Sequence, residues 1–131
     1  MRCVIVDDSP EFLRTASELL ECDGITVVGA VSTGAQARRA CRQLKPDVAL
    51  VDIYLGTETG LDVARQLAGQ TGTKPPQVIL ISASVGEEIA DMITDSQAVS
   101  FVPKEGLSGA VIRGILARSK SAALPPQCNS R

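Results

Sequence analysis

Short apolar runs recur along the chain, and each is followed by polar or turn-forming residues. Runs of this kind predict strands that are buried on both faces of a sheet. Between the runs, apolar residues recur three and four positions apart, which predicts helices with one buried face. The pattern therefore alternates strand and helix along most of the chain. The expected strands cover residues 3–6, 25–31, 48–51, 78–81 and 99–102.

Residues that begin and end helices occur where this alternation requires them. Ser9 and Pro10 supply an N-cap and a proline for the first helical position. Lys45 is followed by Pro46, and a helix is expected to end there because the residue before a proline resists the α conformation. The expected helices follow Ser9, follow Ser32 or Thr33, follow the loop 56–60, and cover residues 83–95 and about 107–118.

Five strands that alternate with helices predict an α/β domain with a parallel sheet, because each crossover between parallel strands needs a covering helix. We expect a flavodoxin-like sheet with strand order 2-1-3-4-5, and a Rossmann-type sheet is the competing arrangement. Residues 1–120 are expected to form one domain, and residues 121–131 a flexible tail. In such a sheet, the carboxyl ends of the strands share the edge at which ligands bind.

The composition narrows the classes of function. A net charge of −2 and an aromatic content of 2% disfavour binding to nucleic acid or to a membrane surface. The chain has no histidine, so the commonest general base and metal ligand is absent. Its four cysteines form no CxxC pair, and no apolar stretch reaches the roughly 20 residues of a membrane span. We therefore expect a cytoplasmic protein in which oxygen atoms would bind any metal.

Polar residues that can carry chemistry follow four of the apolar runs. Asp7 and Asp8 follow the first run, Asp52 the third and Ser82 the fourth, and Lys104 lies just beyond the fifth. Taken singly, these residues have ordinary roles as a helix cap, a polar strand end and a solvated lysine. Taken together, they would converge at one edge of the sheet. Each close carboxylate pair there would cost about 3 to 4 kcal/mol, and hard oxygen ligands of this kind suit Mg²⁺.

With Phe101 in the fifth expected strand, this set resembles the active site of the receiver domains of bacterial two-component response regulators. The resemblance covers roughly residues 2–118, and the segments 80–84 and 101–104 are most similar to the LuxR-like subfamily. It implies a phosphoacceptor signalling domain rather than an enzyme. The phosphoryl donor would be a histidine kinase, a phosphotransfer protein or a small acyl phosphate. Too few residues follow the last expected helix for a DNA-binding domain, so direct nucleic-acid binding is not expected.

The resemblance also implies a nucleophile and a set of metal ligands. Asp52 would take the phosphoryl group. Asp7, Asp8, Asp52 and the main-chain carbonyl of Tyr54 would hold Mg²⁺ or Mn²⁺, with Asp7 acting mostly through water. These roles come from the family and not from the spacing of the residues.

Further roles follow from the same resemblance. Lys104 and Ser82 would contact the transferred phosphoryl group. Ser82 and Phe101 would couple phosphorylation to a conformational switch. The surface formed by the last two expected helices and the strand between them would be the regulated partner face, or a homodimer face. Tyr54 and Ser84 would tune the rate of dephosphorylation.

Departures from the family pattern leave alternatives open. Gly56 stands where many receivers have a proline, and Pro103 precedes Lys104 instead of following it, so the isomer of the Lys104–Glu105 peptide is open. One alternative function is a degenerate receiver that acts as an interaction module without phosphorylation. Another is a phosphohydrolase of the haloacid dehalogenase type, in which a second aspartate would stand at the position of Tyr54.

Overall fold

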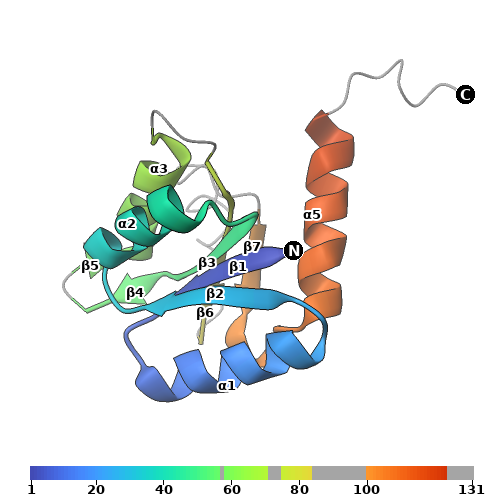
Figure 1. Ribbon diagram of the computed structural model, residues 1–131, viewed down its shortest axis with the longest axis horizontal. Coiled ribbons are helices and arrows are strands. Elements are labelled where there is room, and N and C mark those ends of the chain that lie inside the picture. The colour runs from blue at the N-terminus through green and yellow to red at the C-terminus, as the bar shows by residue number, and fades with distance from the viewer. Residues whose placement is uncertain (57, 71–74, 84–99, 124–131) are drawn as a thin grey trace, which may run out of the picture.

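The computed structural model describes residues 1–56, 58–70, 75–83 and 100–123. Five parallel strands form one sheet in the order β2-β1-β3-β6-β7 (Figure 1). Counted along the chain, these strands have the order 2-1-3-4-5, so the flavodoxin-like prediction is confirmed over the Rossmann-type alternative. The strands are β1 (Arg2–Val6), β2 (Thr26–Val31), β3 (Val48–Asp52), β6 (Gln77–Ser82) and β7 (Ser100–Pro103).

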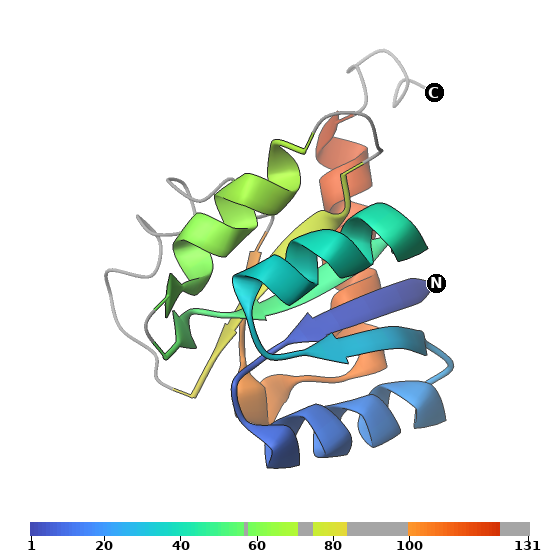
Figure 2. The same ribbon diagram turned by 60° about the vertical axis from the view of Figure 1, so that its left-hand side comes forward.

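Helices cover both faces of this sheet. On one side lie α2 (Gly34–Leu44) and α3 (Gly60–Ala68), and on the other lie α1 (Pro10–Cys22) and α5 (Gly109–Ala123) (Figure 2). The helix expected over residues 83–95 falls, apart from its first residue, outside the described part of the chain.

Alternate residues of the strands enter two separate apolar cores. In β1, Cys3 and Ile5 pack with α1 and α5, whereas Val4 and Val6 pack with α2 and α3. All four side chains are fully buried. Burial on both faces explains why these strands are continuous apolar runs in the sequence rather than alternating ones.

Side-chain caps begin the first two helices. Ser9 Oγ accepts a hydrogen bond from the backbone N–H of Phe12, as expected. Thr33 Oγ1 accepts one from the backbone N–H of Gln36. The cap of α2 is therefore Thr33 and not Ser32.

The loop between β3 and α3 contains a short antiparallel hairpin that the apolar pattern does not predict. Its strands are β4 (Tyr54–Leu55) and β5 (Glu58–Thr59). Gly56 lies between them with a φ of 64°, a conformation that favours glycine. Glu58 Oε1 accepts a hydrogen bond of 2.8 Å from the backbone N–H of Gly34. This contact ties the hairpin to the start of α2.

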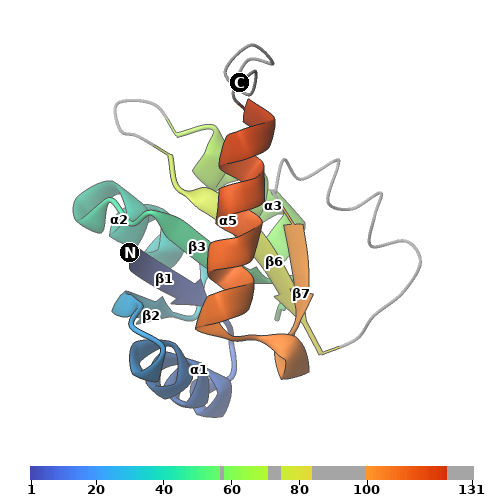
Figure 3. The same cartoon turned by 90° about the vertical axis from the view of Figure 1, so that its right-hand side faces the viewer.

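The chain after β7 departs from the sequence prediction. A 3-10 turn, η1 (Lys104–Gly106), comes first, and α5 begins at Gly109, two residues later than expected. The Gly109 N–H donates to Asp23 Oδ2 at 2.7 Å, so a side chain at the end of α1 caps the start of α5. The helix α5 lies against the sheet (Figure 3) and continues to Ala123. The boundary expected at residue 120 therefore lies inside this helix.

Candidate functional site

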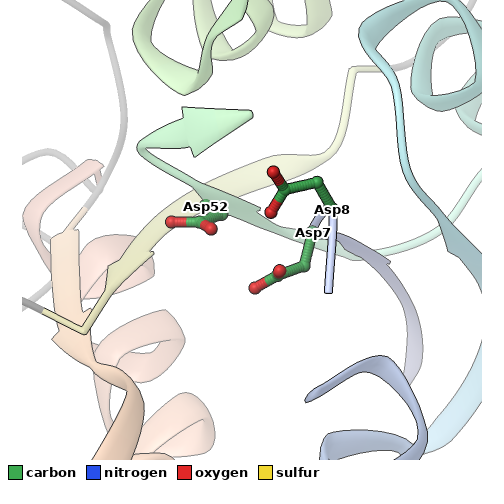
Figure 4. A group of neighbouring side chains, drawn as sticks. All are labelled: Asp7, Asp8 and Asp52. Carbon is green, nitrogen blue, oxygen red and sulfur yellow. The ribbon is translucent and has the colours of Figure 1, made fainter. Parts of the chain in front are cut away.

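Three carboxylates meet at the carboxyl edge of the sheet (Figure 4). Asp7 and Asp8 directly follow β1, and Asp52 is the last residue of β3. These two strands are adjacent and parallel, with Val6 paired to Val51, so the residues that follow them lie side by side. One carboxylate oxygen from each aspartate lies within 4.8 Å of the other two. The expected convergence of the three side chains is confirmed.

Lys104 reaches the same place from the end of β7. Its Nζ lies 2.7 Å from Asp7 Oδ2 and 3.3 Å from Asp52 Oδ2. The contact with Asp52 is a hydrogen bond, whereas the contact with Asp7 is an ion pair outside the hydrogen-bonding direction. Only 19% of the lysine side chain is exposed, so water screens these contacts weakly. Lys104 therefore offsets part of the repulsion between the carboxylates.

Asp7 is fully buried and uses both of its carboxylate oxygens. Its Oδ1 accepts a hydrogen bond of 2.8 Å from the backbone N–H of Ser9, and its Oδ2 faces Lys104. A buried carboxylate is unfavourable unless it is paired, and these two contacts compensate for its loss of water. The same side chain thus holds both the start of α1 and the lysine.

The local charge balance shifts the pKa values of two groups. Burial and the negative charge of Asp7 raise the pKa of Asp52 above its ordinary value of 3.8. Lys104 opposes this rise, as does the backbone N–H of Tyr54, which donates to Asp52 Oδ1 at 3.3 Å. Burial lowers the pKa of Lys104, but its contact with Asp7 and the charge of Asp52 outweigh this effect and raise it overall. The site therefore has less positive charge than its carboxylates need for compensation.

The donor set fits a hard divalent cation. Asp7, Asp8 and Asp52 supply oxygen ligands, which Mg²⁺ and similar ions prefer. Asp8 is exposed, so an ion that keeps several waters can reach it. The raised pKa of Asp52 shows that an added positive charge would stabilise its ionised form.

The two residues of the expected switch lie on the strands beyond β3. Ser82 is the last residue of β6 and is 1% exposed. It pairs in register with Pro103, the residue before Lys104. Phe101, in β7, is partly buried and packs against the core beneath α2 and α3. Their positions agree with the expectation, and their role in switching stays a prediction.

Of the two residues expected to tune dephosphorylation, the structure describes Tyr54 but not Ser84. Tyr54, the first residue of β4, is 61% exposed, while its backbone contacts Asp52. Ser84 lies outside the described residues. The Lys104–Glu105 peptide, whose isomer the sequence leaves open, is trans.

Phe12 is a site residue that the sequence analysis does not single out. The centroid of its ring lies 4.5 Å from Lys104 Nζ. Helical spacing marks Phe12 only as an apolar residue on the inner face of α1. No sequence signal connects it to a lysine near the other end of the chain.

The family profile of the response regulator receiver domain matches residues 3–113. The chain belongs to the receiver-domain family. The matched region runs from β1 into α5 and contains Asp7, Asp8, Asp52, Ser82 and Lys104. The resemblance drawn from the sequence is therefore confirmed at the level of the family.

Curated relatives place receiver domains within longer proteins. Over 101 residues the chain is 35% identical to the transcriptional regulatory protein KdpE of Mycobacterium tuberculosis, covering 77% of this chain and 43% of that protein. Over 113 residues it is 35% identical to a protein-glutamate methylesterase/protein-glutamine glutaminase of Natronomonas pharaonis, covering 86% and 31% respectively. The chain spans between 27% and 51% of the length of the curated relatives it matches.

Solved structures show the same fold. The signal receiver domain of the response regulator NarL from Mycobacterium tuberculosis has a TM-score of 0.77 at 29% identity, and the match covers 91% of this chain and 95% of that one. A LuxR-family two-component response regulator from Aurantimonas sp. SI85-9A1 has a TM-score of 0.78 at 22% identity, covering 92% and 85%. LuxR-family receivers are therefore among the structural neighbours.

The chain is a receiver domain of two-component response regulators, and its role is that of a phosphoacceptor. Receiver domains of this family act with histidine kinases or phosphotransfer proteins. None of the helices in the described part of the chain has the length and apolar character that crossing a membrane requires.

Proposed function

We propose that Asp52 is the residue that accepts the phosphoryl group. The observation that carries this proposal is the contact between Asp52 Oδ2 and Lys104 Nζ at the carboxyl edge of the sheet. Asp7 is a poorer nucleophile because it is fully buried and its oxygens are held by contacts of 2.8 and 2.7 Å, whereas both contacts of Asp52 are 3.3 Å long. Asp8 is exposed, and the ion pairs of Lys104 among the described residues are with Asp7 and Asp52. Asp52 contacts Lys104, and its carboxylate lies at the end of the central strand.

The proposed reaction transfers a phosphoryl group from a histidine kinase, a phosphotransfer protein or a small acyl phosphate. A carboxylate oxygen of Asp52 forms a bond to phosphorus as the bond from phosphorus to the leaving imidazole nitrogen or acyl oxygen breaks. The ammonium of Lys104 stabilises negative charge on the transferred oxygens. The hydroxyl of Ser82 donates a hydrogen bond to one of these oxygens after transfer. The product is an aspartyl phosphate.

Mg²⁺ or Mn²⁺ is the cofactor that fits this site. Asp7, Asp8, Asp52 and the main-chain carbonyl of Tyr54 would hold it, with Asp7 acting mostly through water. When bound, the ion offsets the charge of the carboxylates and of the transferred phosphoryl group. Without a cation, three carboxylates and one ammonium leave a site that repels an anionic donor.

A groove beside β7 and α5 is the proposed regulated partner face, together with the helix expected over residues 83–95, of which only residue 83 is among the described residues. The groove has a volume of about 390 Å³, and Phe101 and Val111 are among its lining residues. Val111 is 37% exposed, which leaves apolar surface for a protein partner or a second copy of the chain. A phosphate on Asp52 would act on this groove through Ser82 and Phe101, by favouring one of two arrangements of these side chains.

The remaining alternatives differ from this proposal at identifiable residues. A degenerate receiver would keep the fold but lack the residues needed for phosphoryl transfer. In this chain Lys104 contacts both Asp7 and Asp52. A phosphohydrolase of the aspartyl-nucleophile type would need a carboxylic acid where this chain has Tyr54. Both the contacts and the family support a signalling phosphoacceptor over an enzyme.

The test of Asp52 is the intact mass of the protein after treatment with acetyl phosphate and Mg²⁺. Wild type should gain one phosphoryl group, and Asp52→Asn should gain none. Asp62→Asn is the matched control, because Asp62 lies on the exposed surface of α3, paired with Arg65. It should be phosphorylated as wild type is. An equal adduct on wild type and Asp52→Asn would contradict the assignment.

A further inference from the structure

Among the described residues, three recorded contacts surround the ammonium of Lys104, and two of them are with carboxylates. Asp7 and Asp52 lie 2.7 and 3.3 Å from Nζ. The third group is the ring of Phe12, whose centroid lies 4.5 Å from the same atom. This distance is within the range of a cation–π interaction, which strengthens when the cation is removed from water. With 19% of the lysine side chain exposed, the ammonium is largely shielded.

The ring is placed by the same aspartate that pairs with the lysine. Asp7 Oδ1 accepts a hydrogen bond of 2.8 Å from the backbone N–H of Ser9. Ser9 Oγ in turn accepts one of 3.3 Å from the backbone N–H of Phe12. These bonds fix the first turn of α1, on which Phe12 lies, and the ring then contacts Lys104. The contacts form a closed circuit from Asp7 through Ser9, Phe12 and Lys104 back to Asp7.

We propose that Phe12 is a positioning residue for phosphoryl transfer, whose ring holds the Lys104 ammonium beside Asp52. This inference rests on the proposed roles of Asp52 and Lys104. A lysine side chain is a flexible four-carbon stem with a point charge, so carboxylates alone define its direction poorly. Charge that is already in place when the reaction begins stabilises the transition state more than charge that must first be ordered.

The ring differs from the two carboxylates in how it responds to a divalent cation. A cation held by Asp7 and Asp52 would compete with the ammonium for the same oxygens. The ring is not a ligand for such an ion, so its hold on Lys104 would persist. The contribution of Phe12 should therefore be largest in the metal-loaded protein, the form proposed to accept the phosphoryl group.

The test compares three variants of the full chain in Mg²⁺. Phe12→Leu keeps an apolar side chain but removes the ring, and Phe12→Tyr keeps a six-membered aromatic ring. Leu13→Ala is the packing control, because Leu13 is the next residue of α1 and packs against the core beneath α1 and α5. The measurements are the rate of phosphorylation by acetyl phosphate and the proton shifts of the methylene group next to Lys104 Nζ. The latter report the ring directly, because an aromatic ring shifts nearby protons upfield.

Phe12→Leu should be phosphorylated about fivefold more slowly than wild type, the rate equivalent of about 1 kcal/mol. Its Lys104 methylene protons should lose their upfield shift. Phe12→Tyr should match wild type in both measurements, and Leu13→Ala should keep the wild-type rate. The proposal is overturned if Phe12→Leu keeps the wild-type rate, if Phe12→Tyr is as slow as Phe12→Leu, or if Leu13→Ala slows equally.

Failure of the proposed function would give a different result. If wild type took no phosphoryl group at Asp52, the role of Phe12 in transfer would fall with it. The proton shifts would still show whether the ring holds Lys104, because they are measured without a phosphoryl donor. If Asp52 is phosphorylated and the upfield shift is absent from wild type, the positioning role alone is wrong.

Discussion

The two oxygens of the Asp52 carboxylate have different partners. Oδ1 accepts a hydrogen bond from the backbone N–H of Tyr54, and Oδ2 faces Lys104 at an equal distance of 3.3 Å. A phosphoryl group on Asp52 would therefore form beside the backbone of Tyr54. The Tyr54 side chain starts from that backbone, and the residue is 61% exposed. Tyr54 is thus placed to influence how water reaches an acyl phosphate.

We expect Tyr54→Asn to shorten the lifetime of the phosphoprotein about fivefold, equivalent to about 1 kcal/mol of barrier. The bulky ring shields the acyl phosphate, whereas a short amide can orient an attacking water. Tyr54→Phe, which keeps the shield and loses only the hydroxyl, is the control and should decay as wild type does. The decay of each phosphoprotein would be timed at one Mg²⁺ concentration. If Tyr54→Asn decays no faster than wild type, shielding by Tyr54 does not set the lifetime.

At the scale of elements, the first residue of α3 lies in close contact with the backbone at the end of β3. A Cβ at Gly60 would lie 1.9 Å from the backbone oxygen of Asp52, far inside contact distance. The Gly60 N–H also donates a hydrogen bond of 2.6 Å to the backbone oxygen of Ile53. Only glycine allows α3 to begin this close to the backbone of Asp52.

Gly60→Ala should therefore destabilise the protein by about 2–4 kcal/mol, because the new methyl group meets backbone that cannot move independently of Asp52. Gly114→Ala is the contrasting substitution within α5. Among the described residues, the added methyl group would meet only Arg118 Nη1, at 3.6 Å, so it should stabilise the helix by about 0.5–1 kcal/mol. Urea unfolding of the two variants would measure both effects. Equal changes in the free energy of unfolding would show that movement of the surrounding backbone relieves the close contact at Gly60.

The elements differ in how far the sequence predicts them. The strands and the site edge follow from apolar runs that end in Asp7, Asp52 and Ser82, because burial on both faces makes those runs continuous, whereas the runs alone leave a Rossmann-type strand order open. The hairpin of β4 and β5 has no such signal, since two-residue strands carry no periodicity. The start of α5 has a local cap, because Ser108 Oγ accepts a hydrogen bond from the backbone N–H of Val111, and a second contact comes from Asp23 at the end of α1. The contact from Asp23, 86 residues away, leaves no local trace in the sequence.

The sequence predicts the site residues that belong to the family motif. It does not predict the site contacts that depend on how the elements pack against one another. Asp7, Asp8, Asp52 and Lys104 each follow an apolar run, so their convergence follows from the topology. The contact of Phe12 with Lys104 depends on the tilt of α1 against the sheet, which the periodicity of one helix does not determine. The same holds for Glu58, whose hydrogen bond joins the hairpin to the start of α2.

At the scale of the whole molecule, two buried thiols make stability depend on alkaline pH. Burial raises the pKa of Cys3 to about 12 and that of Cys41 to about 11. Unfolded thiols ionise near 9.0, so above that pH the unfolded state has released protons that the folded state still holds. Stability from these thiols is therefore complete below about pH 9 and is lost as the pH rises toward 11 and 12.

We expect the free energy of unfolding to fall between pH 9.5 and 10.5, by up to about 1.4 kcal/mol per pH unit for each buried thiol. Cys41→Ala should be less stable than wild type near pH 7 but should lose stability less steeply above pH 9. Cys22→Ala, at an exposed position, removes no buried thiol and should keep the wild-type slope. Urea unfolding across this pH range would measure the slopes. Parallel slopes for all three proteins would show that the buried thiols do not control the alkaline loss.

The carboxylate cluster should also link the stability of the whole domain to divalent cations. Without a cation, burial and then the negative charge of Asp7 raise the pKa of Asp52, so folding makes its ionised form less favourable. An ion that binds the folded cluster but not the unfolded chain stabilises the fold by mass action, by about 2.7 kcal/mol at a concentration 100 times its dissociation constant. The same carboxylates that destabilise the metal-free domain thus become a source of stability when an ion is present.

Addition of Mg²⁺ should therefore raise the melting temperature of wild type, and a chelator should reverse the increase. Asp8→Ala should be as stable as wild type or more so in chelator, because it relieves repulsion at the cluster, but should gain much less from Mg²⁺. Asp62→Asn removes a carboxylate from an exposed ion pair on α3 and should respond as wild type does. Thermal unfolding of the three proteins across a Mg²⁺ titration would decide between these outcomes. If Asp8→Ala gains as much as wild type, the ion acts elsewhere on the protein, because a general effect of ionic strength does not depend on one aspartate.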